Sequence, residues 1–503
     1  MSASKRKGDR SRLDGFEIEI FKLVQREATS EQWKQWLRAP LEHAAAAGNL
    51  DLFTRLMDAG ADGEAGWRGC HGRTLLGAAA YGNNSDKMVQ ALLEAGAKRD
   101  VNAVFGTANE SALHVAAARG AEASCTALMI AGAKPDLRDR RERSPLHLAA
   151  EAGHHGVTGS LLLNRADVHA KTADQMTPLH LAASKGHTLC ISALLLGGAD
   201  KDVFDDAGGT PLLEAAGNNH LEAVEKLLAA GANRGIRAGN YDYSPLEIAA
   251  NRGHATIVKA FLDEDSSAVH ATDDAGWTTL HSCVDGLDGP VHDNSDVVRV
   301  LLEAGADVNA KTTDVFFRTS LHVAVNFRLA SIGTIRALLK AGANVNSRDK
   351  NEQTPLHTAC TCSNVTGVEI LLRWGADEKL TDDGGNTPTD VIGASPENGN
   401  NDEEIEVDNQ RIRQMLARAP ADRSWRRRGW LVLSRSCPTR VQIANGRSRG
   451  TSCSAKVVRV SDESSDRGRE RTEDEMMVDL RDLVGRLVGL EADGLFRLVV
   501  GFL

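Results

Sequence analysis

One short segment recurs through most of this sequence, and its repetition constrains the fold more than any other feature. The clearest copy runs from Thr177 to Asp200. A period of about 20–50 residues indicates stacked supersecondary units rather than one compact core, because each unit then contacts only its neighbours. Successive copies start 33 to 41 residues apart, at Ala39, Thr74, Ser111, Ser144, Thr177, Thr210, Ser244, Thr278, Thr319, Thr354 and Thr387.

Each copy has the features of two short helices separated by a turn. Thr177 can cap the first helix with its hydroxyl, and Pro178 suits the first helical position because its missing N–H needs no partner there. Gly186 and Gly198 can end the two helices, because glycine readily adopts the left-handed conformation. Leucines and alanines at helical spacing give each helix an apolar face. Such a unit buries that face only against another copy.

This pattern resembles the ankyrin repeat, whose signature is Thr-Pro-Leu-His-x-Ala with a period of about 33 residues. The match is clearest at Ser144–His147, Thr177–His180 and Thr354–His357, and about eleven copies lie between residues 39 and 394. The resemblance implies an all-α fold, namely an α-solenoid of helix-turn-helix repeats joined by β-hairpin loops. A small helical extension is expected after the array.

Composition and charge change at both ends of the array and predict its boundaries. A segment with apolar residues at helical spacing precedes the first copy, and we interpret it as a cap that covers the first repeat. The predicted organisation is a disordered basic N-terminus at 1–12, a helical cap at 13–38, the repeat array at 39–394, a degenerate closing repeat with a polar loop at 395–419, an Arg-rich and charged linker at 420–474, and amphipathic C-terminal helices at 475–503.

Two copies depart from the rule that glycine ends the second helix. Arg165 stands where most copies have glycine, and the copy around Asp263–Asp265 lacks the closing phrase altogether. A non-glycine residue in the left-handed region costs on the order of 1 kcal/mol. We therefore interpret both positions as weak joints. The Gly- and Asp-rich segment Asp285–Asn294 is interpreted as a surface loop inserted into one repeat.

No set of residues has the spacing of a catalytic or metal site. The chain lacks the glycine-rich phosphate-binding motifs, the zinc motif His-Glu-x-x-His and the nucleophilic serine elbow. Histidine recurs at the fourth position of the repeat, and the resemblance implies that these residues make structural hydrogen bonds. We therefore predict no enzymatic activity, no cofactor, no metal and no small-molecule substrate. The recurring histidines are His114, His147, His180, His281, His322 and His357.

The chain has the sequence features of a cytoplasmic protein. It contains no apolar run of about 18 residues that could span a bilayer, and its start lacks the apolar stretch of a secretory signal. The 8 cysteines show no disulfide framework, which is typical of free thiols in a reducing compartment. Nuclear entry stays open as well, because Lys5–Lys7 and the Arg-rich segment are basic.

The resemblance implies that the β-hairpin before each copy projects like a finger and that the fingers line a concave groove for protein partners. Exposed aromatic residues are favoured at binding hot spots. Residues 39–394 contain 31 Lys and Arg against 45 Asp and Glu, a net charge of −14, so the groove should favour basic or neutral segments. The predicted partner-binding residues are Tyr241, Tyr243, Trp277, Phe316, Phe317 and Phe204, with the acidic Asp205 and Asp206.

Three functions stay open from the sequence. The first is a non-catalytic scaffold that binds a partner protein in the acidic groove. The second is a substrate-recognition subunit of a larger complex, such as a ubiquitin ligase, recruited through the helices at 475–503. The third is a regulator that binds nucleic acid or acidic lipid, which only the Arg-rich stretch Arg411–Arg449 could attract. The sequence assigns neither a partner nor an oligomeric state.

Overall fold

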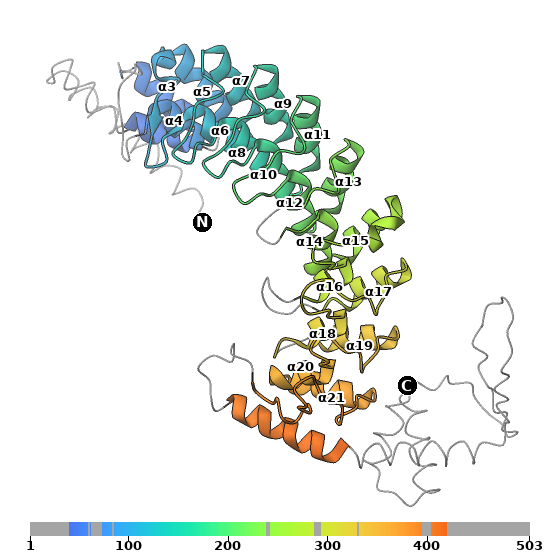
Figure 1. The fold of residues 1–503 in the computed structure, drawn as a ribbon. Coiled ribbons are helices and arrows are strands. Elements are labelled where there is room, and N and C mark those ends of the chain that lie inside the picture. The colour runs from blue at the N-terminus through green and yellow to red at the C-terminus, as the bar shows by residue number, and fades with distance from the viewer. Residues whose placement is uncertain are drawn as a thin grey trace, which may run out of the picture. The chain divides into compact units, whose positions relative to one another are not determined.

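The computed structural model describes residues 40–58, 61, 73–82, 85–237, 242–285, 293–328, 331–394 and 404–419. These residues form successive pairs of short helices joined by loops (Figure 1). The chain divides into two compact units, one made of residues 1–272, 278–283 and 296–306, and the other of 273–277, 284–295 and 307–503. The predicted N-terminus, N-terminal cap, linker and C-terminal helices lie outside the described residues.

The first unit is built from two rows of helices, and the helices of each row contact one another in order along the chain. The first row contains α4 (Leu75–Tyr81), α6 (Ala112–Arg119), α8 (Pro145–Glu151), α10 (Pro178–Ser184), α12 (Pro211–Gly217) and α14 (Pro245–Asn251). The second row contains α5 (Ser85–Glu94), α7 (Glu122–Ile130), α9 (His155–Leu163), α11 (Thr188–Leu196), α13 (Leu221–Ala229) and α15 (Ala255–Glu264).

Seven further elements complete the described residues of this part of the chain. They are α3 (Leu50–Asp58), the 3-10 helices η2 (Ala97–Asp100) and η3 (Ser266–His270), the antiparallel strands β1 (Val104–Phe105) and β2 (Glu110–Ser111), α16 (Thr279–Val284) and α17 (Ser295–Glu303). The predicted ankyrin-repeat solenoid is therefore confirmed, with a two-stranded sheet as a minor addition.

The second unit repeats the same arrangement with α18 (Ser320–Val325), α19 (Ile332–Lys340), α20 (Pro355–Thr361) and α21 (Val365–Arg373). The copy that starts at Thr387 forms turns instead of a helix. Residues 404–419 are helical, with Ile412 and Leu416 buried. This helix is held by the ion pair between Arg328 and Asp408, whose closest atoms are 2.8 Å apart. The degenerate closing repeat at 395–419 stays a prediction, and its residues 395–403 lie outside the described ranges.

The recurring histidines cap the first helices, as the resemblance implied. The backbone N–H of Thr177 donates to His180 Nδ1 at 3.1 Å, so the ring hydrogen is on Nε2, which donates to the carbonyl oxygen of Gly209 at 3.2 Å. The imidazole of His180 therefore caps the N-terminus of its own helix and also donates a hydrogen bond to the backbone of the next repeat. The same pair of bonds recurs at His114, His147, His322 and His357.

A second set of histidines, which precedes the second helices, also joins neighbouring repeats. The Nε2 atom of His220 is 3.0 Å from the carbonyl oxygen of Ser184 in the preceding repeat. The rings of His154, His187 and His254 make the equivalent bond at 3.0 to 3.1 Å. Each repeat interface in this region thus has polar bonds on both sides of its apolar contacts.

Arg165 adopts the left-handed conformation with φ +64°, whereas the equivalent Gly198 has φ +87°. Because glycine avoids the clash of Cβ in this region, we expect Arg165→Gly to raise the free energy of unfolding by about 1 kcal/mol. Urea unfolding of the full chain, followed by circular dichroism, measures this change. The reverse substitution Gly198→Arg should lower the stability by a similar amount. Equal stability of all three chains would show that this joint is not strained.

Candidate partner-binding surface

In the described part of the chain, the loop before most first helices is a tight hairpin, here called a finger, closed by a backbone hydrogen bond. In the finger Asp139–Arg143, the N–H of Asp139 donates to the carbonyl oxygen of Arg143 at 2.9 Å. The carboxylate of Asp139 accepts the N–H groups of Arg141 and Arg143, both at 2.8 Å. The same closure over five residues occurs in the fingers that begin at Thr172, Asp205, Asp273, Asp349 and Asp382.

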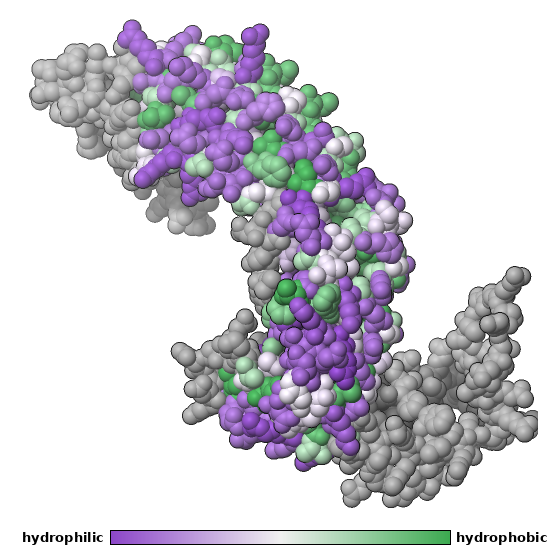
Figure 2. Space-filling model, in the orientation of Figure 1, coloured by the Kyte–Doolittle hydropathy of each residue, from purple (hydrophilic) through white to green (hydrophobic). Residues whose placement is uncertain are grey.

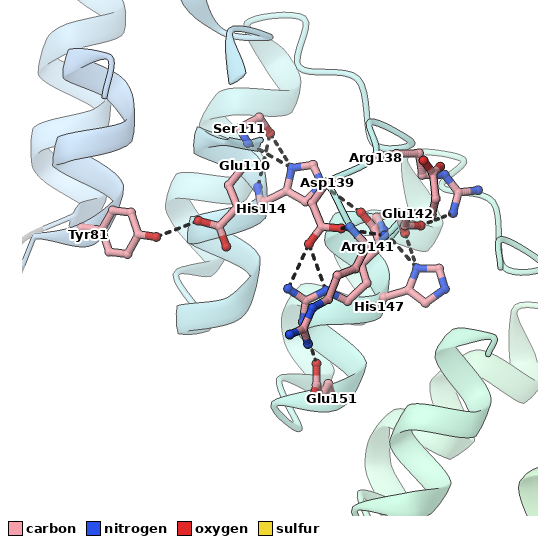
Figure 3. A network of polar contacts seen from close by, with 12 residues as sticks. Tyr81, Glu110, Ser111, His114, Arg138, Asp139, Arg141, Glu142, His147 and Glu151 are labelled. Atoms are coloured by element: carbon pink, nitrogen blue, oxygen red, sulfur yellow. Dashed lines mark hydrogen bonds and ion pairs between the residues drawn. The ribbon is translucent and has the colours of Figure 1, made fainter. Parts of the chain in front are cut away.

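The arginines of the finger Asp139–Arg143 show how much of a charged tip is structural. Arg143 pairs with Asp139 at 2.9 Å and with Glu151 at 3.3 Å. Arg138 donates to the carbonyl oxygens of Glu142 and Lys171, at 2.8 and 2.9 Å. Figure 3 shows the bonds of Asp139, Glu142 and Glu151 in one network with the capping histidines His114 and His147 on the adjoining helices. The side chains of Arg138 and Arg143 are therefore bonded within the array, whereas those of Arg140 and Arg141 are exposed.

Backbone hydrogen bonds also join several of the described fingers to the one before. In the first unit, the N–H of Ala173 donates to the carbonyl oxygen of Arg141 at 3.1 Å, and that of Asp206 to Asp174 at 3.0 Å. In the second unit, the N–H of Asp383 donates to Asn351 at 3.0 Å. The tips are consequently fixed relative to their neighbours although they lie on the surface.

One finger of the second unit is longer than these others. The N–H of Thr312 donates to the carbonyl oxygen of Arg318 at 2.9 Å, which closes seven residues instead of five. The lengthened finger, Thr312–Arg318, is bound on both sides: the N–H of Thr313 donates to Ala275 at 2.8 Å, and the N–H of Lys350 donates to Phe316 at 2.8 Å. Its two additional residues therefore project from a fixed base.

Three apolar side chains occupy the tip of the lengthened finger. Val315, Phe316 and Phe317 are 64%, 41% and 42% exposed. The guanidinium carbon of Arg318 lies 4.4 Å from the centre of the Phe316 ring, within the range of a cation–π contact. Apolar side chains that stay exposed on a firmly held loop are a feature of binding surfaces.

The backbone of Phe317 is strained. Its φ of +50° lies in the left-handed region, where a bulky side chain is an outlier. The five-residue fingers named above also have one left-handed residue before their last residue, which is glycine in three of them (Gly208, Gly276 and Gly385) and Glu142, Gln175 or Glu352 in the others. The chain therefore keeps a phenylalanine at a position where glycine is more stable.

Asp314 organises the lengthened finger. Its carboxylate accepts hydrogen bonds from Thr312 Oγ1 at 2.6 Å and from the N–H groups of Phe316 and Phe317 at 2.9 and 3.1 Å. The side chain of Trp277 donates a further bond from the neighbouring finger. Partial burial alone would raise the pKa of Asp314, but these hydrogen bonds lower it below its ordinary value. The carboxylate is thus charged at neutral pH and holds the aromatic tip in place.

The other predicted binding residues have different surroundings. Phe204 and Asp206 are exposed on a finger of the first unit, where the carboxylate of Asp205 accepts the N–H of Gly209 at 2.6 Å. Tyr243 is only 8% exposed, so its ring belongs to the interior. Tyr241 lies outside the described residues. The structure therefore brings together Trp277, Phe316 and Phe317, and it adds Val315 and Arg318, which the sequence analysis did not identify.

Two features of the described residues bear on metal and redox chemistry, namely the grouping of possible metal ligands and the pKa values of the cysteine thiols. It contains no group of three or more His, Cys, Asp or Glu side chains placed to hold a metal ion. Burial raises the pKa of the Cys125 thiol to about 12 and those of Cys283 and Cys360 higher still, so these thiols are unreactive at neutral pH. None of the helices in the described ranges is both long and apolar enough to cross a membrane.

Comparisons with known proteins agree with the architecture. A family model that describes three copies of the ankyrin repeat matches the chain at residues 41–139, 113–205, 146–238, 212–312 and 293–382. BCL-6 corepressor-like protein 1 from Homo sapiens is 28% identical over 143 residues, which are 28% of this chain and 6% of that protein. A putative ankyrin repeat protein from Rickettsia bellii (strain RML369-C) is 31% identical over 88 residues, 18% of this chain and 34% of that protein. The matches span about a third or less of each relative.

Proposed function

Because the chain belongs to the ankyrin repeat family, whose repeats are protein–protein interaction modules, we propose that it is a non-catalytic scaffold that binds a partner through the lengthened finger Thr312–Arg318. The observation that carries this proposal is the exposed aromatic tip on a backbone bonded to both neighbouring fingers. Aromatic and arginine side chains are the commonest hot-spot residues of protein interfaces. Phe316, Phe317 and Arg318 supply both kinds.

The fixed backbone of this finger supports binding, because a tip that is already ordered loses little entropy when a partner docks. The carboxylate of Asp314 holds the N–H groups of Phe316 and Phe317 at the tip. The strained backbone of Phe317 also supports a role in binding, because residues that lower local stability are found more often at functional sites. Trp277 extends the aromatic surface onto the adjoining finger.

The charge of the array supports a basic or neutral partner segment. Residues 39–394 carry a net charge of −14, from 31 Lys and Arg against 45 Asp and Glu. Such a surface accelerates encounter with basic segments and repels nucleic acid. The free, mostly buried cysteines of the described residues support a reducing compartment, and we place the scaffold in the cytoplasm.

The proposal is tested with the double variant Phe316→Ala, Phe317→Ala. Because both rings contact solvent, their removal should leave the array folded but weaken partner binding at least about tenfold. The measurement is affinity capture with the full chain as bait, followed by titration of the captured partner. Trp374→Ala is the matched control, since it removes an exposed aromatic ring from the residue that follows α21 in the same unit. Equal recovery of every partner by the double variant would refute the proposal.

Phe317→Gly separates binding from stability. Glycine is the residue found at this position in three of the other fingers, so the variant should be as stable as the parent chain or slightly more stable. We expect it nevertheless to bind the partner more weakly. A loss of binding without a loss of the melting temperature excludes unfolding as the cause.

A further inference from the structure

A row of exposed apolar side chains crosses the second helices of three consecutive repeats in the first unit. Ile130, Leu163 and Leu196 are the last residues of α7, α9 and α11, and they are 83%, 86% and 90% exposed. We call this row the ridge. At the equivalent position, other second helices have Glu94, Glu303, Lys340 and Arg373. Exposed leucines are common singly, but three at one repeated position form a continuous surface.

The same three helices are almost free of charge on every side. They have nine residues each and contain one Asp, Glu, Lys or Arg among them, Glu122. Two or three such residues occur in each of α5, α13, α15, α17, α19 and α21. Figure 2 shows hydrophobic surface at the upper right margin of the view, where α7 and α9 lie in Figure 1. Helices that are apolar all round are normally covered, yet in the single chain these three face solvent.

A second row, of small residues, runs beside the ridge. It lies four residues before the ridge on each helix and consists of Thr126, Gly159 and Ser192. Residues four apart are neighbours on one helix face. Elsewhere this position holds long polar side chains: Gln90, Glu225, Lys259, Arg299, Arg336 and Glu369. The face therefore presents a row of large apolar side chains next to a shallow uncharged row.

We propose that this face, defined by the ridge and the small row, binds a second copy of the chain. Two copies placed with their helices antiparallel set the ridge of each over the small row of the other, as ridges pack into grooves between helices. A second copy also supplies three side chains at the same repeat spacing. Because residues 39–394 carry a net charge of −14, the surfaces of two arrays repel one another elsewhere, and this uncharged face is where they can approach.

The size of the face sets the strength of the association. Three helices about 10 Å apart and about 13 Å long present roughly 400 Å² on each copy. The two copies together bury roughly 800 Å², less than the about 1,200–2,000 Å² of a stable interface, so the dimer forms weakly and reversibly rather than permanently. The association is independent of the lengthened finger, which belongs to the other unit.

Sedimentation velocity of the full chain between about 1 and 100 μM tests the proposal, because small interfaces dissociate in this range. We expect the parent chain to shift from monomer to dimer. Leu163→Glu introduces glutamate, which two other repeats have at the equivalent position as Glu94 and Glu303. Because it buries a charge in the proposed interface, it should weaken the dimer at least about tenfold. Gly159→Arg should do the same without harm to the fold, because a Cβ there meets nothing within 4 Å and glycine is a poor helix former.

Ala229→Glu is the matched control, since it adds the same charge at the equivalent position of α13, beyond the ridge. It should dimerise like the parent chain. A parent chain that stays monomeric overturns the proposal and assigns the face to another occupant, such as the amphipathic segment 475–503 or a lipid surface. Undiminished dimerisation of both Leu163→Glu and Gly159→Arg overturns it as well.

Discussion

Lowering the pH from about 7 to 5 is expected to remove several kcal/mol from the free energy of unfolding of the array. The cause is the set of buried capping histidines. Burial lowers the pKa of His147 and of His322 to about 4, from an ordinary value of 6.5. Burial also lowers the pKa values of His114, His180 and His357. All five rings stay neutral in the folded chain at pH values where they would be charged in the unfolded chain.

The direction follows from proton binding. Between pH 4 and 6.5 the unfolded chain binds more protons at these histidines than the folded chain does, so stability falls as the pH falls. Above the ordinary pKa the contribution is fully present and constant. At pH 5, a histidine whose pKa is lowered from 6.5 to about 4 costs about 2 kcal/mol, so His147 and His322 together cost about 4 kcal/mol.

Urea unfolding of the full chain at several pH values between about 7 and 5 measures this loss. His147→Gln provides the control. The variant lacks the bond to Met176 and should be less stable at neutral pH, but its further loss on acidification should be smaller by about 2 kcal/mol. Stability that does not change over this pH range would show that the capping histidines are not the buried neutral groups described above.

The repeat architecture could be predicted because its determinants are local. Thr177, Pro178 and His180 start a helix, Gly186 ends it, and each unit needs only the next copy to bury its apolar face. The register of every clear copy is confirmed for this reason. The weak copy at Thr387 forms turns, in line with its departure from the pattern at Thr389 and Asp390, where other copies have leucine and histidine.

The binding surface was only partly predictable, because exposure depends on contacts between fingers. Tyr243 and Phe316 both lie in finger segments, yet the first is buried and the second is exposed. The sequence did contain a sharper signal. Fourteen residues separate Gly305 from Thr319, but twelve separate Gly198 from Thr210, and the difference is the two additional residues of the lengthened finger. The 41-residue interval from Thr278 to Thr319 was ascribed to the insertion at Asp285–Asn294 alone, although two of its additional residues belong to the lengthened finger.

The ridge was missed for a different reason. Leucines at the end of a second helix fit the pattern of core residues, and Leu161, Leu162 and Leu163 are consecutive in the sequence. Only the helix geometry shows that Leu161 is buried whereas Leu163 is exposed. The sequence comparison that reveals the ridge is between repeats, since Glu94 and Arg373 mark the position as a surface one.

A single methyl group at Gly186 is expected to destabilise the array more than the same group at Gly198. Both glycines are left-handed, with φ +72° and +87°, so alanine costs about 1 kcal/mol of backbone strain at either position. A Cβ on Gly198 meets nothing within 4 Å, but a Cβ on Gly186 lies 2.5 Å from His220 Nδ1. The ring must therefore move, and it loses its hydrogen bond to the carbonyl oxygen of Ser184.

We expect Gly186→Ala to lower the free energy of unfolding by about 3 kcal/mol and Gly198→Ala by about 1 kcal/mol, because only the first leaves an interface carbonyl without its donor. Urea unfolding of the two full-length variants compares them directly. The double variant Gly186→Ala, His220→Ala completes the test. If the clash with the ring is the cause, Gly186→Ala costs much less in a chain that already lacks the ring, whereas an equal cost in both backgrounds would assign the whole effect to backbone strain. The same contact recurs between Gly120 and His154 and between Gly153 and His187, so the result extends to three consecutive repeat interfaces.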